Sequence, residues 1–281
     1  MKIKGKKINH LITDLDDTLS ESCKPITKGI SKCILCWLKK NKTFAIITMQ
    51  CFKEVYGNVI LPLKEAINKS QSEFHSSLYV FCCGGSVGYK IVFINMEAFV
   101  ELKYQSNCYK IMKTINSKLE MTEYFKSGYL LKRFRGESIS LGVSKLLEYN
   151  HRLDFYKKLK NLIEEDSQNT LSMHFNTNKA SSAHIISRNV TKATGINYLL
   201  NHENLKLEHS VIMGDDFSNE GMDTAMCTFN SKALYISVGS DLGDQGAKNI
   251  KKYGEFLHFP EGGPQKSEEI LREFLLTTDY E

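Results

Sequence analysis

The sequence predicts an α/β protein with a parallel β-sheet core and an inserted α+β segment. Strand-like apolar runs alternate with helical patterns near both ends of the chain, which is typical of a parallel sheet covered by helices. This rhythm is interrupted between residues 87 and 188, where helices and strands follow one another in a different order. The 281 residues are enough for about two domains of roughly 150 residues each.

The first stretch of the chain alternates between strands and helices. Residues 8–13 and 43–48 are apolar runs with strand character, and residues 27–40 between them carry apolar side chains at helical spacing. A second helical stretch follows to about Asn68, and residues 78–83 form a third apolar run. We therefore expect three strands of the core sheet and two of its helices before residue 84.

The rhythm changes after Gly84-Gly85-Ser86 and returns near residue 191. In between we expect helices around residues 111–119 and 152–165, and strands within residues 129–141, 171–175 and 183–187. A helix over residues 191–200, strands at 209–213 and 233–238, and a last helix then complete the core. Ser267 followed by two glutamates is typical of the start of that helix. The expected domains are a core of residues 1–86 and 189–281 and an inserted unit of residues 87–188.

Composition and charge exclude several classes of protein. The chain is 42% hydrophobic and 25% charged, unlike collagenous or mostly disordered chains. Its net charge of +5 is spread along the sequence, so no nucleic-acid partner is expected. The longest apolar run, Cys33 to Leu38, is far shorter than the roughly 20 residues of a membrane span. The sequence also has no secretory signal pattern, so we expect a cytoplasmic protein with no membrane partner. The sequence makes no prediction about the oligomeric state.

The eight cysteines predict reduced thiols rather than a disulfide framework. Cys33 and Cys36 have the spacing of half a zinc site, but they fall within a helical pattern and no second cysteine pair completes four ligands. We expect these two side chains to pack in the core. The histidines are scattered singly, so no zinc site is predicted.

Two clusters of carboxylates follow predicted strands. Asp14 and Asp16 come directly after the first strand, and their spacing of two puts both on one side of an extended backbone. Asp215 follows the strand at 209–213, and Asp223 lies shortly beyond it. Ligands of open α/β sheets bind at the carboxyl ends of strands, where these acids would crowd together and require a cation. Hard oxygen ligands without His or Cys indicate Mg²⁺.

Two further residues suit the binding of a phosphoryl group. Thr48 ends the second strand, and Lys192 begins the helix that resumes the core. A hydroxyl, a lysine and the N–H groups at a helix N-terminus commonly bind phosphate oxygens. Each residue alone also suits an ordinary strand cap or a surface lysine, but their place at element ends favours a shared anion site.

In this order, the motifs resemble those of the haloacid dehalogenase-like phosphohydrolases. The match consists of Asp14-Leu-Asp16-Asp17-Thr18, the strand ending in Thr48, Lys192, and Gly214-Asp215 with Asp223. The place of the insertion resembles the type IIB subclass, in which an α/β cap covers a Rossmann-like core. Residues 14–22, 135–140 and 189–196 are most similar to bacterial phosphomannomutase-like and sugar-phosphatase proteins.

The resemblance implies a phosphatase that acts on a phosphate monoester of a small metabolite, such as a sugar phosphate. Asp14 would attack phosphorus to form an aspartyl-phosphate, which water then hydrolyses. Asp16 would protonate the departing alcohol and then accept a proton from that water. Lys192 and Thr48 would bind the phosphoryl oxygens.

The resemblance also implies Mg²⁺ as the cofactor. Its ligands would be Asp14, the backbone carbonyl of Asp16, and Asp215, with Asp223 in support. In the insertion, Arg133 and Arg135 are candidates for binding the substrate.

Two alternatives remain at this point. A phosphosugar mutase would use the same intermediate but return the phosphoryl group to a sugar, for which the few arginines of the insertion give little support. A binding protein that kept the fold but lost turnover is the second alternative. Its support is that Met49 and Gln50 follow Thr48 where the family usually has glycines, and that Met222 replaces an asparagine.

Overall fold

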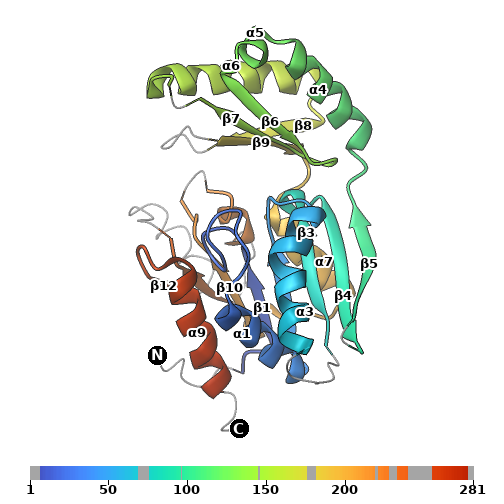
Figure 1. Ribbon diagram of the computed structural model, residues 1–281, viewed down its shortest axis with the longest axis vertical. Coiled ribbons are helices and arrows are strands. Elements are labelled where there is room, and N and C mark those ends of the chain that lie inside the picture. The colour runs from blue at the N-terminus through green and yellow to red at the C-terminus, as the bar shows by residue number, and fades with distance from the viewer. Residues whose placement is uncertain are drawn as a thin grey trace.

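The computed structural model describes residues 7–68, 76–95, 97–144, 146–175, 182–218, 221–227, 233–239 and 255–277. It contains two β-sheets, an eight-stranded sheet below and a four-stranded sheet above it in Figure 1. The expected α/β class is confirmed, because the six strands from β12 to β3 pair in parallel. Within the described residues, every helix is too short or too polar to span a lipid bilayer.

The larger sheet has the strand order β12-β11-β10-β1-β2-β3-β4-β5. Neighbouring strands β1 and β10 align His10 with Ser210 and Thr13 with Met213, so Asp14 and Asp215 follow their strands at the same edge of the sheet. The strands are β1 (His10–Thr13), β2 (Thr43–Ile47), β3 (Leu78–Cys82), β4 (Val87–Ile94), β5 (Glu97–Gln105), β10 (Ser210–Gly214), β11 (Leu234–Ser237) and β12 (Glu255–His258).

Helices cover both faces of this sheet, which explains why its strands are continuous apolar runs. On one face, Leu11 packs with side chains of α1 (Lys28–Lys39), α3 (Leu61–Asn68) and α9 (Gly263–Thr277). On the other face, Ile12 packs with side chains of α7 (Lys192–His202). Figure 1 shows α1, α3 and α9 in front of the sheet and α7 behind it.

Helix α1 illustrates how local sequence sets an element. The Thr27 hydroxyl accepts a hydrogen bond from the backbone N–H of Ile30 at 3.1 Å and so caps the helix. Cys33 is buried against the sheet, and burial raises the pKa of its thiol to about 11. Cys36 is exposed, contrary to the expected core packing, because the buried stripe of α1 runs through Ile34, Trp37 and Leu38 and Cys36 lies outside it. All eight cysteines are free thiols.

The four-stranded unit, as we call α4 through β9, is an antiparallel sheet with helices on one face only. Its strand order is β6-β7-β9-β8, and its own core joins the sheet to α4 and α6. The helices lie on the side away from the larger sheet (Figure 1). Its elements are α4 (Tyr109–Met121), α5 (Glu123–Lys126), β6 (Leu130–Phe134), β7 (Ile139–Val143), α6 (Tyr149–Asp166), β8 (Leu171–Phe175) and β9 (Ser182–Ser187).

Two boundaries differ from the sequence expectations. Strand β4 pairs antiparallel to β3 and β5 pairs antiparallel to β4, so residues 87–105 extend the larger sheet, although the sequence placed them in the insertion. A hairpin that adds to a sheet edge interrupts the strand–helix rhythm, so the pattern resembled a new domain. The last helix, α9, begins at Gly263 rather than Ser267, which is buried one turn inside it. The hydroxyl signal at Ser267 therefore marks no helix end.

Candidate active site

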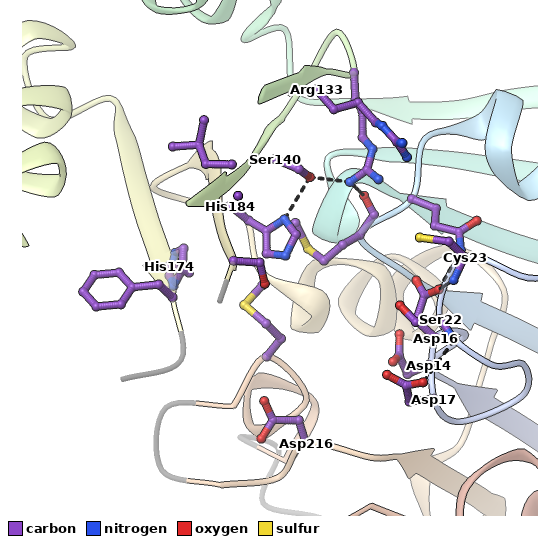
Figure 2. A pocket seen from close by; sticks show the side chains of 18 of the residues that line it. Asp14, Asp16, Asp17, Ser22, Cys23, Arg133, Ser140, His174, His184 and Asp216 are labelled. Carbon is purple, nitrogen blue, oxygen red and sulfur yellow. Dashed lines mark hydrogen bonds between the residues drawn. The ribbon is translucent and has the colours of Figure 1, made fainter. Parts of the chain in front are cut away.

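A pocket of about 590 Å³ lies between the carboxyl edge of the larger sheet and the four-stranded unit. Figure 2 shows Asp14, Asp16 and Asp17 grouped on one side of it, with Arg133, Ser140 and His184 across from them. The aspartates follow β1, whereas the facing residues come from β6, β7 and β9. The pocket thus has a floor formed by the larger sheet and a roof formed by the four-stranded unit.

The floor is built around the ammonium group of Lys192. This group lies 2.7 Å from Asp14 Oδ1 and 2.6 Å from Asp223 Oδ1, and all three side chains are buried. Lys192 is the first residue of α7, whose N-cap Thr191 accepts a hydrogen bond from the N–H of Ala193 at 3.2 Å. The capped helix start thus fixes the lysine between two carboxylates from different strand ends.

Asp223 also organises the loop after β10. Its Oδ2 accepts hydrogen bonds from the backbone N–H groups of Asp215 and Asp216, both at 3.0 Å. Gly214 permits this approach, since a Cβ at that position would lie 2.3 Å from the same oxygen. With Lys192 on its other oxygen, Asp223 holds the positions of Asp215 and Lys192 together.

The carboxylates of this floor repel one another. Burial, opposed by Lys192 and aided by Asp223, raises the pKa of Asp14 to about 7. Burial and the charges of Asp223 and Asp14 raise the pKa of Asp215 to about 9. Burial lowers the pKa of Lys192, but the two adjacent carboxylates outweigh burial and raise it overall, so the lysine stays charged.

One possible ligand oxygen each from Asp14, Asp215 and Asp223 lies within 4.8 Å of the others. A donor set of carboxylate oxygens fits a hard divalent cation, whose charge would offset their repulsion. Asp223 already accepts hydrogen bonds on both oxygens, so Asp14 and Asp215 have more capacity for a cation. The Asp16 side chain lies outside this group; the sequence assigned only its backbone carbonyl to the metal.

Asp16 lines the pocket beside Asp14, with its carboxylate turned toward the loop after β2. Its Oδ1 accepts hydrogen bonds from Gln50 Nε2 at 2.8 Å and from the N–H of Cys23 at 2.7 Å (Figure 2 draws Cys23). Gln50 is a residue that sequence analysis noted only as a departure from the family. Its carboxamide could have been paired with Asp16 only with knowledge of the adjacent strand ends.

Thr48 differs from its expected placement. Its side chain is completely buried and does not line the pocket, and its hydroxyl oxygen accepts a hydrogen bond from the Gln50 N–H at 3.1 Å. Thr48 thus supports the loop that carries Met49 and Gln50, both of which reach the pocket. The bulky residues after Thr48 fill the space that glycines would leave open.

Arg133 and Arg135 both line the pocket, as expected, but each is already paired with Glu54. Arg133 Nη1 lies 2.7 Å from Glu54 Oε1, and Arg135 Nε lies 2.9 Å from Glu54 Oε2. Arg135 also donates to the Met49 carbonyl at 3.1 Å. Glu54 belongs to the short helix α2 (Phe52–Val55) of the core, so these pairs join the roof to the floor.

Sequence analysis missed a polar row across the roof. The strand register aligns Arg133, Ser140, His184 and His174 across all four strands. Ser140 accepts a hydrogen bond from Arg135 and lies 3.0 Å from His184 Nδ1. Burial and nearby cations lower the pKa of His184 to about 3, and burial and Lys160 lower that of His174, so both rings are neutral. Alternation of polar residues along β7 and β9 was the available signal.

Comparison with models of known protein families identifies the family of this chain, in agreement with its fold and site motifs. A family model described as haloacid dehalogenase-like hydrolase matches residues 11–222, so the chain belongs to this family. The expected family and the expected hydrolase class are confirmed. Among curated proteins, none matches this sequence.

Solved structures with the same fold have names that refer to different phosphorylated compounds. An IMP-bound IMP-nucleotidase of Plasmodium falciparum is 15% identical, with a TM-score of 0.62, and the match covers 96% of this chain and 68% of that one. The sucrose-phosphatase of Synechocystis sp. PCC6803 is 14% identical (TM-score 0.58; 96% and 98% covered). A trehalose-6-phosphate phosphatase related protein is also 14% identical (TM-score 0.59; 96% and 98% covered). At such identities these likenesses establish a shared fold.

Proposed function

We propose that this protein is a Mg²⁺-dependent phosphatase that hydrolyses a phosphate monoester of a small metabolite through an aspartyl-phosphate. The observation that carries the proposal is Asp14, held 2.7 Å from the buried ammonium group of Lys192 and beside Asp215 at the pocket floor. A carboxylate nucleophile, a fixed cation and a second carboxylate for a metal ion are the parts that phosphoryl transfer to aspartate requires. The phosphatase names of the fold neighbours agree with it.

In the first step, an oxygen of Asp14 forms a bond to phosphorus as the bond from phosphorus to the organic oxygen breaks. That oxygen takes a proton from Asp16 and leaves as an alcohol. In the second step, water attacks phosphorus, gives a proton to Asp16, and the bond between phosphorus and Asp14 breaks. Phosphate is released and both aspartates return to their initial states.

The remaining floor residues stabilise charge. Lys192 neutralises phosphoryl oxygens and keeps Asp14 oriented, because its ammonium group is fixed by two carboxylates. Asp14 and Asp215 would hold Mg²⁺, which when bound supplies positive charge to an anionic substrate next to an anionic nucleophile. Asp223 positions Asp215 through the backbone N–H groups that it accepts.

The roof supports a substrate with a neutral, hydroxylated organic group, such as a sugar monophosphate. Among the described residues that line the pocket, every Lys and Arg already has a carboxylate partner: Lys132 with Glu120, Arg133 and Arg135 with Glu54, and Lys192 with Asp14. A mutase needs cations for a second phosphate, so this pairing favours hydrolysis. Neutral His184 and Ser140 suit hydroxyl groups. The four-stranded unit would act as the cap over this substrate. The cytoplasmic location that the sequence predicts stays a prediction.

The test is a screen of phosphorylated metabolites, with inorganic phosphate measured with and without Mg²⁺. We expect Mg²⁺-dependent release from p-nitrophenyl phosphate and faster release from a sugar monophosphate. Glucose 1-phosphate with a trace of the 1,6-bisphosphate should yield phosphate rather than the 6-phosphate. Faster formation of the 6-phosphate would replace the phosphatase with the mutase, and absence of both reactions would favour a binding protein.

A further inference from the structure

Gln50 connects the acid of the proposed reaction to a helix outside the pocket. Its carboxamide is 1% exposed and has partners at both ends. Nε2 donates to Asp16 Oδ1 at 2.8 Å, and Oε1 accepts from Asn58 Nδ2 at 3.0 Å. The chain of contacts therefore runs from Asn58 through Gln50 to Asp16.

The direction of the two hydrogen bonds of Gln50, to Asp16 and to Asn58, is fixed by the groups at both ends. The unprotonated oxygen of a carboxyl group only accepts hydrogen bonds, whether or not the other oxygen carries a proton, so the Gln50 amide must turn its NH₂ group toward Asp16 Oδ1. That orientation leaves the Gln50 oxygen buried, where an acceptor without a donor is costly. The Asn58 NH₂ group supplies this donor, so the Asn58 side chain decides which end of Gln50 faces Asp16.

Both donors to Asp16 meet the same oxygen. Oδ1 accepts from Gln50 and also from the Cys23 N–H at 2.7 Å. An oxygen that accepts two N–H bonds has no room for a proton along those directions. The proton that Asp16 gives and receives must therefore be carried by Oδ2.

A π-helical turn places Asn58. The turn spans Tyr56–Ile60, between α2 and α3, and the N–H of Leu61 donates to the carbonyl of Tyr56 five residues earlier. The Asn58 carbonyl accepts from the N–H of Ile26 at 2.9 Å, in the loop that follows Asp16. Single π-turns within α-helices are frequent at functional sites. Asn58 thus holds the loop after Asp16 by its backbone carbonyl and acts on Asp16 through the Gln50 side chain.

We propose that Gln50 and Asn58 are positioning residues that direct Asp16 Oδ2 toward the oxygen of the leaving group. This proposal rests on the proposed phosphatase function, because it assigns how that function's acid is held. It also gives a role to Gln50, which at this position departs from the family's usual glycines.

The test compares two substrates with different needs for an acid. Alkyl phosphates release a poor leaving group that requires protonation, whereas p-nitrophenyl phosphate requires little. Asn58→Asp keeps the shape of the side chain but replaces the donor by an acceptor, which turns the Gln50 oxygen toward Asp16. We expect kcat for a sugar monophosphate to fall by about 30-fold and kcat for p-nitrophenyl phosphate by less than about threefold.

Further variants make the test specific. Gln50→Met keeps volume and removes the donor, so it should show the same selective loss, and adding Asn58→Asp to it should cause no further loss. Asp16→Asn sets the upper limit of the effect. Asn197→Asp, on the exposed side of α7, is the matched control and should leave both rates unchanged.

The outcomes separate the two proposals. Equal losses on both substrates, no loss in either variant, or additive losses in the double variant would overturn the positioning role. Thermal unfolding of each variant identifies misfolding, in which case the other single variant decides. If the wild-type protein hydrolyses neither substrate, or if Asp14→Asn stays active, the phosphatase function itself fails.

Discussion

The floor and the roof of the pocket use charge in opposite ways. On the floor, the buried carboxyl groups of Asp14 and Asp223 each lie within hydrogen-bond distance of the buried ammonium group of Lys192. On the roof, His184 is neutral, and the arginines are paired with Glu54. Buried charges suit a reaction at a phosphoryl group, whereas neutral polar groups suit recognition of an uncharged organic group. Changes to the floor should therefore affect every substrate, and changes to the roof should affect only some.

The largest effect is expected from Asp14→Asn. The variant removes the charge of the proposed nucleophile but preserves the shape of the side chain, so phosphate release should fall by at least about a thousandfold for aryl and sugar phosphates alike. Asp17→Asn is the neighbouring control; Asp17 has a φ of 56°, a conformation that asparagine also adopts, and the loss should stay below about tenfold. Retention of more than a few per cent of the rate in Asp14→Asn would remove the nucleophile from the floor.

Removal of metal should abolish turnover of every substrate. It should also make the stability of the folded protein depend on pH. In the metal-free protein the pKa of Asp215 is raised to about 9 and that of Asp14 to about 7. Because these pKa values are raised, the folded state binds the two protons more tightly than the unfolded state does. This contribution to the free energy of unfolding is fully present below the ordinary pKa of 3.8 and is lost as pH rises through the folded-state pKa values. The metal-free protein should therefore lose stability between about pH 4 and pH 9.

The proposed Mg²⁺ would bind the ionised carboxylates and offset that loss. The increase in Tm caused by Mg²⁺ should be roughly 5 °C at a hundred times Kd near pH 8, and much smaller at pH 5. Thermal unfolding with EDTA or Mg²⁺ at both pH values measures it. A shift that is equal at pH 5 and pH 8 would place the metal away from Asp14 and Asp215.

Arg135→Ala should have a medium effect, and one that is selective for the substrate. The Arg135 side chain is 6% exposed and the Arg133 side chain is 62% exposed, and both pair with Glu54. Solvent therefore weakens the pair of Arg133 with Glu54 more than that of Arg135. We expect KM for a sugar phosphate to rise about tenfold in Arg135→Ala and less than about threefold in Arg133→Ala. The rate on p-nitrophenyl phosphate should change little. If Glu54→Gln does not reproduce the Arg135→Ala result, the pairing does not attach the roof.

The smallest effect is expected from His184→Gln. Glutamine keeps a hydrogen-bonding group toward Ser140, so KM for a sugar phosphate should rise only about two- to fivefold, and p-nitrophenyl phosphate should be unaffected. A pKa of about 3 keeps the ring neutral, so the ratio of wild-type to variant KM should be constant between pH 5 and 8. A ratio that changes in that range would mean that His184 carries charge in the complex.

The sequence by itself determined the fold class and the charged floor. Apolar runs without alternation indicated buried parallel strands. Asp14, Lys192 and Asp215 each stand at an element end that the local pattern located, and Asp223 follows in the same acidic segment as Asp215. Because the carboxyl ends of parallel strands share one edge, position along the chain was enough to bring these residues together. The family motifs gave the same residues.

Only the tertiary structure decided how the roof meets the floor. The contacts of Glu54 with Arg133 and of Met49 with Arg135 join residues 79 and 86 positions apart, and no local periodicity encodes such a pair. The link from Asn58 through Gln50 to Asp16 depends on the adjacent ends of β1 and β2 and on a π-turn. Propensity and spacing act within an element, whereas these contacts result from packing between elements, which is why the sequence could name Arg133 and Arg135 as candidates but not their pairing with Glu54.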